Sequence, residues 1–152
     1  MIVSPDRFMY LPDGTYLWTE ARCMRAWSLV QAELTAALPE HERLVLMVGT
    51  PAAGKSTWLE RHADPRFVYL DATMFRREGR RSLVRFAGQL GKPVDAVVLD
   101  TPLDVCLERN AARAPDRQIP EAKLRWMRET YDRDPVSEEE GFDRVTVVKY
   151  IP

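Results

Sequence analysis

The chain has 152 residues, which is enough for one domain with its own hydrophobic core. Hydrophobic residues make up 45% and charged residues 30% of it, and the longest uninterrupted apolar segment, Leu44–Val48, is far too short to cross a membrane. The net charge of −1 excludes a protein that coats nucleic acid through bulk positive charge, so any phosphate recognition has to be local. The N-terminus has no signal-peptide pattern, and we therefore expect a cytoplasmic protein in which Cys23 and Cys106 are free thiols.

Short apolar segments alternate with amphipathic ones along the whole chain. Strands are predicted at residues 2–3, 44–48, 67–70, 96–99 and 145–148, and helices at residues 19–38, 56–62, 80–90, 103–112 and 120–131. Near-continuous apolar strands separated by helices are typical of a parallel sheet that is covered on both faces. The sequence therefore predicts one α/β domain with a five-stranded parallel sheet sandwiched by helices.

Two finer expectations concern burial. The first predicted helix carries an apolar stripe at helical spacing, which we expect to face the core and which consists of Met24, Trp27, Val30, Leu34 and Leu38. The acidic segment 132–143 is expected to be a solvated loop before the last strand.

Residues 49–56 read GTPAAGKS and fit the pattern G-x-x-x-x-G-K-[ST], directly after a predicted strand and at the start of a predicted helix. Glycines let the backbone N–H groups approach phosphate oxygens, and the start of the helix adds the positive end of its dipole. Lys55 is expected to reach the β and γ phosphates of ATP or another nucleoside triphosphate, and the Ser56 hydroxyl to hold Mg²⁺. An ordinary glycine-containing turn is the alternative, and the flanking strand and helix disfavour it. The expected donor-binding residues here are Gly49, Thr50, Pro51, Ala52, Ala53, Gly54, Lys55, Ser56 and Thr57.

Several segments resemble the polynucleotide 5′-hydroxyl kinase family and its P-loop relatives. They are GTPAAGKSTWLER at 49–61, LERNAAR at 107–113, IPE at 119–121 and EGFD at 140–143. The resemblance implies a P-loop kinase fold that transfers the γ-phosphate of ATP, with Mg²⁺, to the 5′-hydroxyl end of DNA or RNA. It also implies a lid whose arginines contact the donor phosphates, with Arg113 as the first candidate and Arg109 and Arg117 as further ones.

The order of the segments differs from that family, in which an acceptor strand with its catalytic Asp follows the phosphate-loop helix. Here the segment after that helix, FVYLDAT at 67–73, resembles the family's later strand, and IVSPDR at 2–7 resembles the acceptor strand. We therefore expect a permuted order: acceptor strand and helix at 1–43, phosphate loop and central sheet at 44–104, lid at 105–143, and last strand at 144–152. The alternative is that residues 1–43 form a docking extension unrelated to the site.

The resemblance also suggests roles for two carboxylates. Asp6 would be the general base, and Asp71 would hold Mg²⁺ together with Ser56. From the residues alone, Asp6 would be only a surface turn that caps the backbone, and Asp71 could be a helix cap. Both alternatives stay open in the sequence.

The acceptor side is less defined. Met9 stands where the family commonly has the arginine that grips the acceptor phosphate, and Arg7, Arg22 or Arg76 is the expected substitute. Tyr10, Tyr16 and Trp18 could stack on a terminal base or belong to the core, and we favour the core for Trp18. Two other functions fit the same donor site: a kinase of a nucleoside or another small molecule, and a regulatory module that binds nucleotide without transfer.

Overall fold

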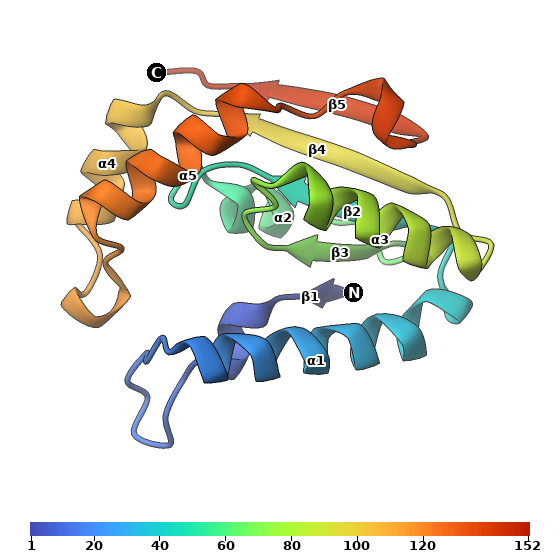
Figure 1. Cartoon of the computed structure of the whole chain (residues 1–152), viewed down its shortest axis with the longest axis horizontal. Helices are drawn as coiled ribbons and strands as arrows, with labels where there is room; N and C mark the ends of the chain where they lie inside the picture. The colour runs from blue at the N-terminus through green and yellow to red at the C-terminus, as the bar shows by residue number, and fades with distance from the viewer.

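A computed structural model describes all residues, 1–152. It contains one five-stranded sheet in the order β1-β3-β2-β4-β5, and every neighbouring pair of strands is parallel (Figure 1). The strands are β1 (Ile2–Val3), β2 (Leu44–Val48), β3 (Val68–Asp71), β4 (Val94–Asp100) and β5 (Arg144–Lys149). The predicted α/β class with a five-stranded parallel sheet is confirmed.

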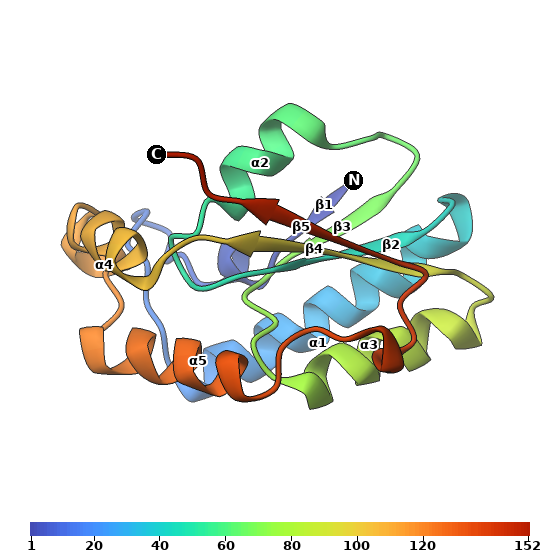
Figure 2. The same cartoon turned by 90° about the horizontal axis from the view of Figure 1, so that it is seen from above.

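Helices cover both faces of this sheet. They are α1 (Glu20–Ala37), α2 (Lys55–His62), α3 (Arg77–Gln89), α4 (Leu103–Ala111) and α5 (Glu121–Arg133), with short 3₁₀ turns η1 (Pro5–Phe8), η2 (Leu38–Glu40), η3 (Pro115–Arg117) and η4 (Glu138–Glu140). Figure 2 shows α2 on one face of the sheet and α1, α3 and α5 on the other. The central strand β2 accordingly has both faces buried, with Leu46 in the core shared with α1 and α3, and Met47 in the core shared with α2.

The largest shift of a predicted strand is at β4, which begins at Val94 rather than at residue 96. Asp95 interrupts the apolar run there, and its carboxylate is buried at 9% exposure. The Arg43 Nη1 atom donates to both carboxylate oxygens at 2.8 and 2.9 Å, and this pairing makes a charge acceptable inside the strand.

Part of the predicted apolar stripe of α1 is wrong. Val30 and Leu34 are buried, but Met24 is 67% exposed and Trp27 is 36% exposed. In Figure 1 the first turns of α1 extend past the carboxyl ends of the strands, so the sheet does not cover the start of this helix. Trp18, expected in the core, is 50% exposed for the same reason, and the Lys123 ammonium lies 4.0 Å from the centre of its ring.

The acidic segment 132–143 is also not the solvated loop that was expected. Asp132 belongs to α5, and Glu140 is buried in an ion pair with Arg80, in which the Nε–Oε1 distance is 2.7 Å and both side chains are 0% exposed. Arg80 also donates to the carbonyls of Met74 at 3.1 Å and Asp134 at 2.8 Å. One buried arginine thus joins the loop after β3 to the end of α5 and to η4.

No helix combines the length and apolar character needed to cross a membrane. Cys23 and Cys106 are both unpaired, as predicted. Burial raises the pKa of the Cys106 thiol, so this residue remains protonated and packs as a small apolar side chain.

Candidate active site

The predicted donor-binding residues 49–57 lie together in the loop between β2 and α2 and in the first turn of α2. Gly54 has a φ of +102°, and a Cβ on Gly49 would come within 3.3 Å of the Cβ atoms of Ala53 and Leu99. Both glycines are therefore required by the loop, one for its left-handed backbone and one for its close packing. The Thr101 hydroxyl at the end of β4 donates to the Ala53 carbonyl at 2.8 Å and holds the loop from outside.

Lys55 lies beneath this loop and is 8% exposed. Its Nζ atom donates to the carbonyls of Gly49 at 3.0 Å and Thr50 at 3.2 Å. Burial lowers the pKa of Lys55, the charges of Asp71 and Asp6 oppose that effect, and the charge of Arg113 adds to it. Three charged groups that the sequence predicts for the site, Asp71, Asp6 and Arg113, therefore contribute to the electrostatic surroundings of Lys55.

Ser56 and Asp71 are in direct contact. The Ser56 hydroxyl donates to Asp71 Oδ2 at 2.7 Å, and the Ser4 hydroxyl donates to the Asp71 carbonyl at 2.9 Å, which ties the end of β1 to the end of β3. A hydroxyl and a carboxylate are oxygen ligands of the kind that Mg²⁺ prefers. This pair beside the phosphate loop fits a magnesium ion that accompanies a nucleotide.

Asp6 lies in η1, at the carboxyl end of β1, and its side chain is exposed. Asp6 Oδ1 accepts a hydrogen bond from the Tyr16 hydroxyl at 3.1 Å. Burial and the neighbouring Asp6 carboxylate raise the pKa of Tyr16, so the phenol stays protonated and remains a donor. The Asp6 carboxylate thus accepts from the side chain of Tyr16, in the loop that follows η1. In a simple turn cap it would accept from a nearby backbone N–H instead.

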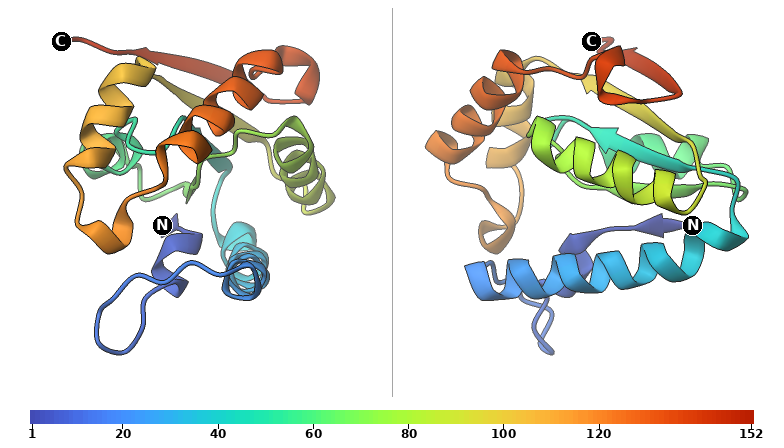
Figure 3. Two further views of the ribbon diagram at one scale, coloured as in Figure 1. Left: turned by 60° about the vertical axis from the view of Figure 1, so that its left-hand side comes forward. Right: turned by 45° about the vertical axis from the view of Figure 1, so that its right-hand side comes forward.

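The segment between α4 and α5, residues 112–120, contacts the loop that precedes α1. Asp116 Oδ2 accepts from the Tyr16 amide at 2.8 Å, and the Arg117 guanidinium lies 5.8 Å from the centre of the Tyr10 ring. Figure 3 shows these two loops facing each other at the same end of the molecule. Tyr16 therefore touches both Asp6 and the segment that the sequence predicts to be a lid.

The three predicted lid arginines have different surroundings. Arg109 Nη1 donates to the Ala52 carbonyl at 3.3 Å and lies over the phosphate loop, and Arg113 is close enough to Lys55 to affect its pKa. Arg117 instead packs on Tyr10, away from that loop. The structure thus brings two of the three to the expected donor site.

The three candidate acceptor arginines also differ. Arg7 is ion-paired with Glu33, and Arg22 donates to the backbone carbonyls of Phe8, Tyr10 and Leu17 at 3.5, 3.3 and 3.2 Å. Arg76 is exposed, with its guanidinium 5.3 Å from the ring centre of Phe75 and 5.2 Å from that of Trp126. Of the three, Arg76 alone makes no ion pair or hydrogen bond with its guanidinium, which packs against two aromatic rings.

Sequence reasoning missed Thr101 and Asp116, and it considered Tyr16 only as a surface for stacking. Thr101 had a usable signal, because it directly follows a strand at the edge where parallel sheets collect ligand-binding groups. Asp116 had none, since its partner is the amide of Tyr16, 100 residues earlier in the chain.

Comparison with known proteins gives one family match. A family model described as an AAA domain matches residues 63–133, which is just under half of the chain and runs from the end of α2 to the end of α5. The phosphate loop, residues 49–56, lies outside the matched segment and is separated from it by the rest of α2, whereas Asp71, Arg109 and Arg113 lie within the match. The fold is that of a P-loop, kinase-like domain. Together with the phosphate loop, this match supports a nucleotide-binding, kinase-like function. Among curated proteins the chain has no match.

Proposed function

We propose that the protein transfers the γ-phosphate of ATP to the 5′-hydroxyl end of DNA or RNA. The observation that carries the proposal is the position of Asp6. Asp6 lies in η1 directly after β1, and the Ser4 hydroxyl at the end of β1 donates to the Asp71 carbonyl at 2.9 Å, which places this turn at the same edge of the sheet as the Ser56–Asp71 pair. A carboxylate there can accept the proton of a hydroxyl that attacks the γ phosphate.

The order of the sheet supports a permuted chain. β1 pairs with β3, and β3 pairs in turn with β2, which leads into the phosphate loop. In our proposal β1, η1 and α1 are the acceptor strand and helix of a polynucleotide kinase, moved ahead of the phosphate loop. A docking extension unrelated to the site would have no reason to pair within the sheet or to bring Asp6 near Lys55.

Each group then has a task in the reaction. The phosphate loop and Lys55 bind the β and γ phosphates, Ser56 and Asp71 hold Mg²⁺, and Arg109 and Arg113 neutralise the transferred phosphoryl group. When bound, ATP with its Mg²⁺ supplies that phosphoryl group. The acceptor hydroxyl oxygen would form the new bond to the γ phosphorus as the bond from that phosphorus to the β–γ bridging oxygen breaks and ADP leaves. The hydroxyl proton would pass to the Asp6 carboxylate.

The test is a transfer assay with γ-labelled ATP and 5′-hydroxyl oligonucleotides of DNA and RNA. The wild type should label the oligonucleotides, and Asp6→Asn should abolish labelling while ATP binding stays unchanged, because the amide cannot accept the proton. Asp13→Asn is the matched control, since Asp13 is an exposed carboxylate in the same N-terminal segment that accepts only from its neighbour Thr15.

Two results would contradict the proposal and select an alternative. Labelling of a nucleoside or another small acceptor, with oligonucleotides left unlabelled, would indicate a small-molecule kinase. ATP binding without transfer to any acceptor would indicate a regulatory module.

Tyr16 gives a second prediction for the same reaction. Tyr16→Phe removes the donor to Asp6 and should lower kcat about tenfold, because a hydrogen bond to a charged group contributes about 1.5–3 kcal/mol. The KM for ATP should not change. Tyr10→Phe is the control, since Tyr10 packs edge-on against Tyr16 at 5.4 Å and its phenol is not bonded to Asp6. Equal effects of the two substitutions would show that only packing matters here.

A further inference from the structure

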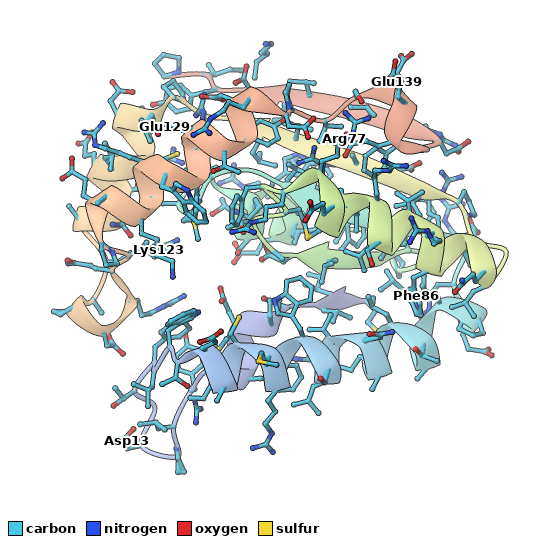
Figure 4. All side chains as sticks on the ribbon, in the orientation of Figure 1. Asp13, Arg77, Phe86, Lys123, Glu129 and Glu139 are labelled. Atoms are coloured by element: carbon cyan, nitrogen blue, oxygen red, sulfur yellow. The ribbon has the colours of Figure 1, made fainter.

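A groove of about 420 Å³ lies between α1 and α3. Of the residues that were assigned a role above, only Arg76 lines it. Its walls include Trp27 and Gln31 of α1, Phe75 and Arg76 of the loop after β3, and Ser82 and Phe86 of α3. Figure 4 shows Phe86 between these two helices. The groove is large enough for one small organic group, within the usual range for ligand pockets.

One residue of the groove's lining is bonded to the phosphate loop. Thr73 lines it, and the Thr73 carbonyl accepts from the Gly49 amide at 3.2 Å. Thr73 also lies two residues after Asp71. The next residue, Met74, is buried with a φ of +48°, and this turn directs the chain from β3 into the wall formed by Phe75 and Arg76. The Thr73 end of the groove is therefore the end joined to the phosphate loop and to the end of β3, where phosphoryl transfer is proposed.

The lining favours a planar aromatic ligand with polar edges. Trp27, Phe75 and Phe86 supply aromatic side chains, while Ser28, Gln31 and Ser82 supply polar groups. Arg76 stands at the same loop with an exposed guanidinium, suited to a phosphate that follows the ring system. Trp27 is moreover an apolar residue that the fold leaves 36% exposed.

We infer that this groove holds the nucleobase of the acceptor's terminal nucleotide, with Arg76 at the phosphate that follows it. The inference rests on the proposed function and names the acceptor subsite of the same reaction. Base stacking on aromatic rings is tolerant of sequence, as an enzyme acting on nucleic-acid ends requires. A free nucleoside shares the base chemistry but lacks the phosphate for Arg76.

The first experiment measures transfer kinetics on two 5′-hydroxyl oligonucleotides that differ only in whether the terminal nucleotide carries a base or is abasic. Trp27→Ala should raise the KM for the base-bearing oligonucleotide about 5- to 150-fold, the range expected for loss of one stacking contact, with the KM for ATP unchanged. On the abasic oligonucleotide, Trp27→Ala should match the wild type. Ser82→Trp, which fills the groove, should act like Trp27→Ala. Met24→Ala is the control, because Met24 lies one turn earlier on α1, is 67% exposed and does not line the groove.

An equal effect of Trp27→Ala on both oligonucleotides, or no effect on either, would overturn the inference while leaving the transfer reaction intact.

The second experiment does not depend on transfer. An oligonucleotide with 5-iodouracil as its terminal base should photocross-link to the peptides that carry Trp27 or Phe75, and the wild-type yield should fall with Trp27→Ala. Cross-linking in the groove without any transfer would support the base site and contradict the proposed function. Transfer with cross-links only outside the groove would support the proposed function and contradict the base site. If 5-iodouridine is both cross-linked and phosphorylated and the oligonucleotide is not, the assignment to a nucleic-acid end is overturned.

Discussion

Lys55→Met is expected to lower phosphoryl transfer by at least about 10²- to 10³-fold, the effect of removing one donor that stabilises charge in a transition state. Lys55 begins α2 directly after Gly54 and lies beneath the phosphate loop. Its ammonium donates to the carbonyls of Gly49 and Thr50. Phosphate oxygens are stronger partners for that charge than carbonyls, so the lysine is held ready for a ligand.

The same substitution is expected to leave the protein at least as stable. Burial lowers the pKa of Lys55, which means that folding removes hydration from its ammonium without full compensation. Methionine has a similar length and carries no charge. Thermal unfolding should therefore give Lys55→Met a Tm equal to or above that of the wild type.

The pH dependence follows from the sign of that shift. The pKa of Lys55 in the folded protein is below the ordinary lysine value of 10.5, so the unfolded chain binds the proton more tightly. The stability lost by burying the charged lysine is therefore greatest at pH values below the folded pKa. The stability difference between Lys55→Met and the wild type should then shrink as the pH rises towards the ordinary value. Urea unfolding at neutral and alkaline pH measures it.

Lys149→Met is the control for both readouts, because Lys149 is 76% exposed and pairs only with Asp100 at the surface. A Lys55→Met protein that keeps its transfer activity would contradict the proposed role of the lysine. One that unfolds more easily than the wild type would contradict the account of its buried charge.

Arg80→Met is expected to lower the free energy of unfolding by about 3–5 kcal/mol, because it leaves the Glu140 carboxylate buried without its partner. The carbonyls of Met74 and Asp134 lose a donor at the same time. For a chain of this length the Tm should fall by roughly 6–20 °C. Urea and thermal unfolding measure the change.

The neighbouring arginine provides the control. Arg81 is exposed on the same helix, and Arg81→Met should change the free energy of unfolding by no more than about 0.5 kcal/mol. The double variant Arg80→Met, Glu140→Leu should recover much of the loss, since a buried ion pair can be replaced by apolar groups of similar size. Equal stabilities of Arg80→Met and Arg81→Met would show that the pair contributes nothing.

Local pattern was sufficient to predict most of the fold and the donor half of the site. The strand Leu44–Val48 was predicted with the bounds that the structure has, because five consecutive apolar residues can be buried only in a strand covered on both faces. The phosphate loop was equally predictable, since its glycines, lysine and serine act within one turn of the chain. These features depend on residues that are neighbours in sequence.

Features that depend on distant partners were not predictable in this way. An acidic run gives no sign that Glu140 pairs with an arginine 60 residues earlier, and helical spacing gives no sign that Trp27 stays 36% exposed and lines a groove. Charge and periodicity describe what a side chain is suited to contact, whereas the packing of β1, α1 and α5 determines what is within reach. The donor site therefore follows from a continuous segment of sequence, while the groove, the Tyr16 contacts and the buried ion pair exist only because the folded chain brings distant segments together.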